Sequence, residues 1–238
     1  MTGTVLLSLG LAGALPAAPA MLLSFEAGAP YVADISGNRL HALLHGGHAL
    51  AEGPRPGLRA LVLRDGAWLE LPEARLLLGD RCSDGTMALW VRPDFDPAGL
   101  PGGTWEGWVT ILYIQKRSGN GLPDGRNEIG LTLHGPQLIA KVVGGEELSP
   151  FAVRPCPLKQ GQWTHLAMTW SPTARRLYVD GQLAAEATGQ FSPTLLDDFP
   201  AAVGRHPSSG KWFFTGAVAD LRLYREPLSA QEVADVAQ

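Results

Sequence analysis

The sequence predicts an all-β domain of many short strands built around one core. The clearest observation is an apolar period of two, as in Leu166, Met168 and Trp170, which is typical of a strand with one buried face. The second is the abundance of turn residues, 29 Gly and 19 Pro, which suits many short strands. The third is size, because 238 residues that are 45% hydrophobic suffice for one large core. We therefore expect one domain over residues 21–238.

Residues 1–20 have the pattern of a signal peptide. An apolar run over residues 5–14 precedes Ala18-Pro19-Ala20, which has the small-x-small form of a signal-peptidase site. This run is too short to cross a bilayer, and no other stretch approaches that length. We expect a secreted, periplasmic or cell-surface protein without a membrane span. The alternative is a cytosolic protein that starts at Met21, because residues 1–4 contain no Lys or Arg.

The charge of the chain argues against nucleic acid as a partner. Its 19 Lys and Arg residues are scattered, and 23 Asp and Glu residues give the chain a formal net charge of −4. Proteins that bind nucleic acid usually gather basic residues into a patch or a stripe. We therefore expect no nucleic-acid partner.

Turn residues and apolar alternation divide the first half of the chain into short strands. Residues 64–66, Arg-Asp-Gly, predict a hairpin between the strands on either side of them. Pro93 ends a longer strand, because proline cannot donate a hydrogen bond to the ladder. The predicted strands cover residues 21–26, 57–62, 67–71 and 85–93, and the segment YVADISGN over residues 31–38 contains a tight turn.

The second half follows the same pattern and ends in a short helix. Residues 116–127 are polar and contain several glycines, so we expect a long loop there. Asp180-Gly181 supplies the positive φ that a turn between strands requires. Ser229 and Glu232 form a capping box at the start of a helix. The predicted strands cover residues 109–115, 128–133, 138–143, 163–170, 177–179, 201–204 and 213–224, with hairpin turns at residues 134–136 and 172–176.

Three motifs in order resemble the laminin G-like, concanavalin A-type jelly rolls. They are the strand GTMALWVRP from Gly85, the hairpin WTHLAMTW…LYVDGQL from Trp163 and the closing strand FFTGAVADLRLY from Phe213. The resemblance covers residues 22–236. It implies a two-sheet antiparallel jelly-roll sandwich with a short C-terminal helix. Because a fold does not fix function, the function needs separate evidence.

Two cysteines, Cys82 and Cys156, each precede a core strand, over residues 87–92 and 163–170 respectively. If these strands pair antiparallel, their N-terminal ends lie at opposite ends of the pair, too far apart for a disulfide. We therefore expect buried thiols.

Glycoside hydrolases share this fold, so the position of paired carboxylates is informative. The laminarinase-like members carry E-x-D-x-E on one strand, because residues two and four apart project from the same face. The nearest segment here has Glu128 followed by Gly130 and Thr132. A single carboxylate cannot serve as both acid and nucleophile. We therefore expect no catalytic residues.

The resemblance also implies a structural Ca²⁺ between the first turn and the closing strand. Oxygen ligands stand at matching places in Glu26, Asp34, Asn38 and Asp220. Many relatives carry a further acid where this chain has Ala219. The alternative is a turn and a strand held by hydrogen bonds alone.

Aromatic residues in loops are candidates for binding sugars, which need exposed aromatic platforms. The candidates are Trp105, Trp108, Trp212 and Tyr31, of which Trp105 is the strongest. The alternative for Trp108 and Trp212 is that they cover the end of the core, because apolar strands follow them at once.

The resemblance favours a non-catalytic, extracellular recognition domain that binds a glycan or a glycoprotein partner. Two alternatives stay open: an enzyme acting on polysaccharide, and a structural or assembly domain of the cell surface.

Overall fold

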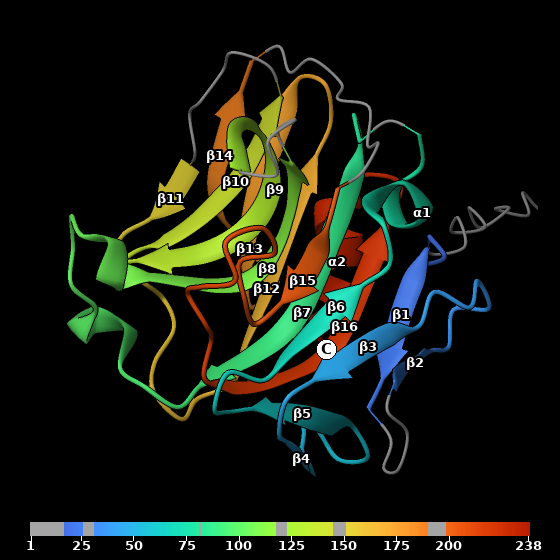
Figure 1. Cartoon of the computed structure of the whole chain (residues 1–238). Coiled ribbons are helices and arrows are strands. Elements are labelled where there is room, and N and C mark those ends of the chain that lie inside the picture. The colour runs from blue at the N-terminus through green and yellow to red at the C-terminus, as the bar shows by residue number, and fades with distance from the viewer. Residues whose placement is uncertain (1–16, 26–30, 81, 118–122, 145–150, 190–198) are drawn as a thin grey trace, which may run out of the picture.

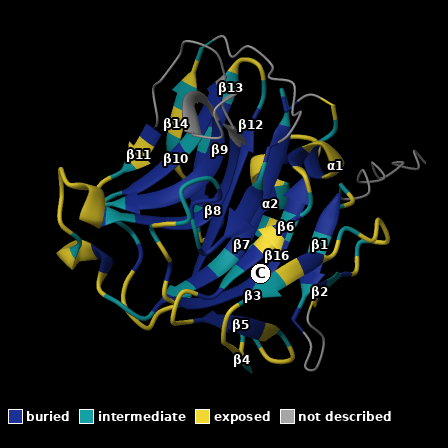
Figure 2. Cartoon of the chain, viewed as in Figure 1, coloured by how far each residue is buried: buried dark blue, intermediate teal, exposed yellow. Residues whose placement is uncertain are grey.

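The computed structural model describes residues 17–25, 31–80, 82–117, 123–144, 151–189 and 199–238. Within them the chain forms an antiparallel jelly-roll sandwich, as the sequence predicts (Figure 1). Residues of the strands are mostly buried, and the exposed residues lie mainly in loops (Figure 2). Glu26, one of the four candidate calcium ligands, lies outside the described residues.

We call the two layers the front sheet and the back sheet. Strand β1 joins them, because it pairs with β2 of the front sheet and with β16 of the back sheet. In spatial order, the front sheet consists of β11 (Phe151–Val153), β10 (Leu138–Gly144), β9 (Pro123–His134), β8 (Trp108–Arg117), β15 (Ala201–Val203), β6 (Trp68–Leu71), β3 (Ala42–His45) and β2 (Tyr31–Asp34). The back sheet consists of β4 (His48–Glu52), β5 (Arg59–Leu63), β16 (Gly216–Tyr224), β7 (Gly85–Pro93), β12 (Thr164–Trp170), β13 (Ala174–Val179) and β14 (Gln182–Thr188), and β1 spans Met21–Ser24.

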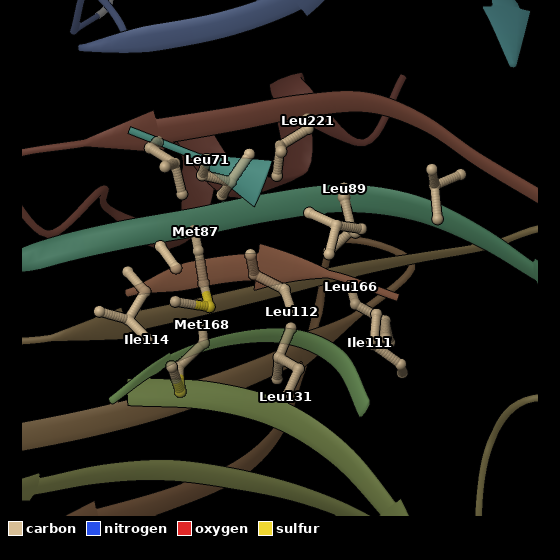
Figure 3. Close-up of a cluster of buried hydrophobic side chains, with 14 of the residues drawn as sticks. Leu71, Met87, Leu89, Ile111, Leu112, Ile114, Leu131, Leu166, Met168 and Leu221 are labelled. Atoms are coloured by element: carbon tan, nitrogen blue, oxygen red, sulfur yellow. The ribbon is translucent and has the colours of Figure 1, made fainter. Parts of the chain in front are cut away.

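The core lies between the two sheets and follows the predicted alternation. Met87 and Leu89 of β7 and Leu166 of β12 point toward Leu112 of β8 and Leu131 of β9 (Figure 3). Strands β7 and β12 pair antiparallel along their whole length, with Leu166 opposite Leu89. This pairing puts Cys82 and Cys156 before opposite ends of the pair, and they form no disulfide with each other. Cys82 is buried as expected, whereas Cys156 is only half-buried. Burial of these large side chains supplies most of the stability of the sandwich.

The helices are short. Helix α1 spans Ala74–Leu78, and α2 spans Ala230–Val236. The N-terminus of α2 is capped by the predicted capping box of Ser229 and Glu232. Single 3₁₀ turns, η1 (Pro97–Gly99) and η2 (Trp105–Gly107), lie between β7 and β8. No helix of the described part of the chain is long and apolar enough to cross a membrane.

The expected hairpin around residues 64–66 is not formed. The chain does reverse there, with Asp65 at φ 52° and Gly66 at φ 79°. However, β5 pairs with β4 and β16 in the back sheet, whereas β6 pairs with β15 and β3 in the front sheet. Leu61 and Leu63 of β5 and Leu69 and Leu71 of β6 are buried between the sheets, so the two strands pack face to face rather than edge to edge.

Two further expectations need correction. The expected loop over residues 116–127 is shorter, because β8 runs to Arg117 and β9 begins at Pro123. Strand β12 is buried on both faces rather than one. The reason is that Leu228 and Val233 of the C-terminal segment cover Ala167 on the outer side of the back sheet. The turn at Asp180 and Gly181, with φ of 49° and 75°, is as expected.

The segment just before β1 is packed against the domain. Ala20 is 6% exposed, and its N–H donates a hydrogen bond of 2.7 Å to the carbonyl oxygen of Leu223. Its carbonyl accepts hydrogen bonds from Asn38 Nδ2 at 2.9 Å and Ser36 Oγ at 3.3 Å. The signal peptide over residues 1–20 stays a prediction, and residues 1–16 lie outside the described part.

We expect Trp170→Ala to lower the free energy of unfolding by about 3–5 kcal/mol, because a large cavity opens in the core. Trp170 is 1% exposed, packs over Gly85 and donates a hydrogen bond of 2.8 Å from Nε1 to the carbonyl of Cys82. Chemical denaturation measures the loss. The matched control is Trp105→Ala, because Trp105 is 75% exposed and should cost less than about 0.5 kcal/mol. A loss below about 1 kcal/mol for Trp170→Ala would contradict the packing.

Candidate functional site

A pocket of about 300 Å³ opens on the outer face of the front sheet, over β8, β9 and β10. Its floor is formed by side chains from these strands and its walls by the loops before β8 and after β15. The pocket is lined by Trp105, Trp108, Tyr113, Gln115, Glu128, Thr132, Lys141, His206 and Trp212. We call it the aromatic pocket.

Strand alternation builds the floor of the pocket. On β9, Ile129, Leu131 and Leu133 belong to the core, so Glu128 and Thr132 face outward. Gly130 lies between them, opposite both Tyr113 on β8 and Lys141 on β10. A Cβ atom at Gly130 would overlap the Tyr113 ring. The absence of a side chain at residue 130 therefore lets the tyrosine ring lie flat across the sheet.

The floor is organised around the buried carboxylate of Glu128. Its Oε2 accepts hydrogen bonds from the Tyr113 hydroxyl at 2.6 Å and from Lys141 Nζ at 2.9 Å. Its Oε1 accepts a hydrogen bond of 2.6 Å from Gln115 Nε2. Burial and the nearby negative charge of Glu128 raise the pKa of Tyr113 well above its ordinary value of 10.0. Tyr113 is therefore a fixed hydrogen-bond donor at neutral pH.

Tryptophan rings form the wall of the pocket. The rings of Trp105 and Trp212 are parallel within 5°, with centroids 5.8 Å apart, as in an offset stack. Trp108 stacks on His134 with centroids 4.2 Å apart, and lies 6.0 Å from Trp212. Lys141 Nζ lies 5.2 Å from the centroid of the Trp108 ring, within the range of a cation–π contact. The most exposed of these rings is Trp105, at 75%.

The loop after β15 holds Trp212 in an unusual backbone conformation. Trp212 has φ 59°, in the left-handed region that bulky residues rarely adopt. Its carbonyl accepts a hydrogen bond of 2.8 Å from the N–H of Thr110 in β8, which fixes the loop to the sheet. The ring meets the edge of His206, with centroids 4.7 Å apart.

Two buried polar atoms in the pocket lack a hydrogen-bond partner among the described residues. They are Oε1 of Gln115 and Oγ1 of Thr132, in side chains that are 1% and 2% exposed. A buried polar atom without a partner costs about 1–3 kcal/mol, so each such atom calls for an explanation. Both side chains belong to the lining of the pocket.

The structure brings three of the four predicted aromatic residues together. Trp105, Trp108 and Trp212 line the aromatic pocket. Trp108 and Trp212 are half-buried, which also agrees with their covering the end of the sandwich. Tyr31 lies elsewhere, on β2 at the other end of the front sheet, with its ring 5.3 Å from that of His41.

A larger cavity of about 590 Å³ lies near Tyr31, over β3, β6 and β15. It offers a poorer platform, because both faces of its tryptophan, Trp68, are occupied. Arg205 lies 3.6 Å above the centroid of that ring, and His45 stacks on it at 4.2 Å. The aromatic pocket is therefore the better candidate, although it is smaller.

Sequence reasoning missed most of the polar residues of the pocket, including Tyr113, Gln115, Lys141 and His206. Glu128 and Thr132 were noted only as positions of a catalytic motif. The alternation of polar and apolar residues on β9 could have indicated a polar outer face, because it places Glu128 and Thr132 on the same side of the strand. The pairing with β8 and β10 is a tertiary property, and no local pattern indicates it.

Both carboxylate oxygens of the predicted calcium ligand Asp34 already accept hydrogen bonds, from β1 and from the turn that follows Asp34. Its Oδ1 accepts hydrogen bonds from the N–H groups of Leu22 and Ser36 at 2.9 and 3.0 Å. Its Oδ2 accepts hydrogen bonds from the Leu40 N–H and the Ser36 hydroxyl, both at 2.9 Å. Burial raises the pKa of Asp34, but these hydrogen bonds outweigh it and leave the pKa below 3.8.

Asp220, the predicted calcium ligand of the closing strand, binds two arginine side chains rather than the turn that contains Asp34 and Asn38. Its carboxylate lies 2.7 Å from Arg55 Nη2 and is bound at both oxygens by Arg222 at 2.8 Å. Among the residues that the structure describes, no group of three or more His, Cys, Asp or Glu side chains converges on one point. Asp220 therefore does not fit a calcium shell with Asp34 and Asn38, and calcium binding stays a prediction.

Comparison with known proteins supports the fold. A family model described as the concanavalin A-like lectin/glucanases superfamily matches residues 64–234. No curated protein sequence matches the chain. Among solved structures, the chain is similar to domain 4 of AbnA, a GH43 extracellular arabinanase from Geobacillus stearothermophilus, in complex with arabinotriose. The TM-score is 0.67 at 21% identity, and the match covers 94% of this chain and 100% of that chain.

The chain is also similar to two neurotoxin binding domains. For the botulinum neurotoxin serotype G binding domain, the TM-score is 0.68 at 12% identity, and the match covers 92% of this chain and 50% of that chain. For the binding domain of botulinum neurotoxin DC in complex with SialylT, the TM-score is 0.62 at 11% identity, with coverages of 92% and 51%. The chain thus spans about half the length of these two. At such identities the likeness shows a shared fold alone.

The environment of His206 predicts a loss of stability in acid. Burial lowers its pKa from 6.5 to about 4, so the folded imidazole stays neutral while the unfolded one binds a proton. Above about pH 6.5, His206 therefore does not lower the free energy of unfolding. As the pH decreases from about 6.5 to about 4, its burial lowers the free energy of unfolding by up to about 3 kcal/mol.

The variant His206→Asn should remove this loss of stability in acid, because asparagine does not titrate. Its amide oxygen can still accept the hydrogen bond that Nδ1 accepts from the Ser209 N–H at 3.2 Å. Urea denaturation between pH 7 and pH 4 measures both proteins. The buried His165, whose pKa is also about 4, contributes equally to both and cancels in the difference. Parallel curves of unfolding free energy against pH would contradict the burial of a neutral His206.

Proposed function

Because the chain belongs to the concanavalin A-like lectin/glucanases superfamily, we propose that it is a recognition domain that binds glycan chains in the aromatic pocket. The observation that carries this proposal is the combination of three tryptophan rings, of which Trp105 is exposed, with buried polar atoms that lack a partner among the described residues, all in one pocket. Sugar sites generally combine these two elements: an apolar wall that packs on the ring and a few fixed polar groups that orient the hydroxyls.

Each part of the pocket has a distinct task in this proposal. The exposed Trp105 ring packs against one face of a sugar, and its stack with Trp212 holds it in place. Gln115 Oε1 accepts a hydrogen bond from a sugar hydroxyl, and the Thr132 hydroxyl binds a second one. Lys141, held by Glu128, donates a third. The ligand thereby satisfies atoms that are otherwise buried without partners, which contributes to affinity.

Similar structures support a binding role. The arabinanase domain 4 was solved with arabinotriose and the neurotoxin DC binding domain with SialylT. We infer a glycan, either free or on a glycoprotein, as the partner of this chain, and an extracellular setting like that of the arabinanase.

We further propose that the domain binds without cleaving. The segment nearest to the E-x-D-x-E pattern begins at Glu128, and on β9 this residue is followed on the same face by Gly130 and Thr132. Its carboxylate is already bonded to Tyr113, Gln115 and Lys141. Among the described residues that line the pocket there is no second acid, and a single carboxylate held by three donors cannot perform the two-step retaining mechanism.

Trp105→Ala should weaken glycan binding by about tenfold or more without lowering the melting temperature, because the ring is exposed and packs on ligand rather than on the core. A glycan array identifies the ligand, and calorimetry measures its affinity. The matched control is Tyr31→Ala, which removes another exposed ring of the front sheet, far from the pocket along the strand order, and should leave affinity unchanged. Equal losses in both variants would contradict the assignment of the pocket.

The purified protein should release no reducing sugar from β-glucan or arabinan, because Glu128 is the single acid among the described residues that line the pocket. A reducing-end assay over many hours measures this. Sustained release that disappears in Glu128→Gln would show that the domain is a hydrolase.

A further inference from the structure

The aromatic pocket has a built-in selection by charge. We propose that the Glu128–Lys141 ion pair, together with the acceptor atom of Gln115, makes the pocket specific for uncharged sugars and excludes carboxylated and sulfated ones. This inference rests on the proposed function, and it names the class of glycan that the pocket accepts.

The first argument is the balance of charge. Of the described residues that line the pocket, only Glu128 and Lys141 carry charge at neutral pH, because the pKa of His206 is about 4. Their side chains are 8% and 19% exposed, and Nζ lies 2.9 Å from Oε2. The two charges compensate each other at close range, so the pocket offers no net positive charge to an anion.

The second argument is the direction of the hydrogen bonds. The amide nitrogen of Gln115 donates a hydrogen bond to Glu128 and so fixes the orientation of the side chain. Oε1 of Gln115 is then the atom left to bind a ligand. That oxygen is buried, has no partner among the described residues and can only accept. A hydroxyl group can donate to it. A carboxylate or sulfate offers acceptor atoms alone, and therefore leaves Gln115 unsatisfied.

The third argument is repulsion. An anionic group that reached Lys141 would also approach the Glu128 carboxylate, which shares the same ammonium group. Like charges in a poorly hydrated pocket repel strongly, and the anion would lose its own hydration as well. The buried carboxylate of Glu128 therefore acts against charged ligands, in addition to fixing its three donors.

The test is an array of paired oligosaccharides, each neutral chain printed beside its C6-carboxylated and its sulfated form. Wild-type protein should bind neutral members at least about tenfold more tightly than their charged partners, and calorimetry on the strongest pair gives the ratio. An affinity for an acidic member that equals or exceeds that of its neutral partner would overturn the proposal. Absence of signal from every member would overturn the proposed function, and the charge selection with it.

Two variants separate charge selection from general damage to the pocket. Glu128→Gln leaves the ammonium group of Lys141 uncompensated, so the preference should shift toward the charged members and decrease as salt is added. The double variant Glu128→Gln with Lys141→Gln is neutral again and should return the preference to uncharged sugars. Circular dichroism checks that both are folded. If the single variant keeps the wild-type ratio of affinities, Glu128 does not select by charge and the proposal is wrong.

Discussion

Burying a carboxylate in a protein costs several kcal/mol unless hydrogen-bond donors surround it. The side chain of Glu128 is 8% exposed on the outer face of the front sheet, and the residues around it are arranged to meet that cost. Strands β8 and β10 supply the donors Tyr113, Gln115 and Lys141. Each donor is then held in one orientation, so the pocket has a fixed polar floor before any ligand arrives.

The same three strands build the core on their other face. Leu112, Leu131 and Leu138 are fully buried between the sheets. Because residues along a strand alternate in direction, rigid packing below the sheet fixes the positions of the groups above it. The tryptophans come from loops anchored to this frame, as in the bond between the Thr110 N–H and the Trp212 carbonyl. Binding groups on loops over a rigid scaffold are a common arrangement in recognition domains.

The sequence allowed the fold to be predicted better than the site. Strands such as β7 and β12 have strict alternation and clear ends, so their bounds followed from local patterns. Their antiparallel pairing, which the sequence analysis took as a condition, is seen only in the structure. Strands β5 and β6 were predicted as a hairpin from the turn residues 64–66. These residues do form a tight turn, but the two strands do not pair. Which sheet each strand enters depends on the partners that bury its leucines, and those partners are distant in the sequence. The same limit explains why the tryptophans were found by residue type, whereas Gln115 and Lys141 depend on pairing across strands.

The backbone of Trp212 places a limit on how this domain can evolve. A tryptophan at φ 59° is strained, and glycine would adopt that conformation without cost. Glycine would also remove the ring that supports Trp105. Selection for thermal stability alone therefore favours losing the aromatic wall, whereas selection for ligand binding favours keeping it. The strained backbone at Trp212 is thus the energetic cost of holding the aromatic wall in place.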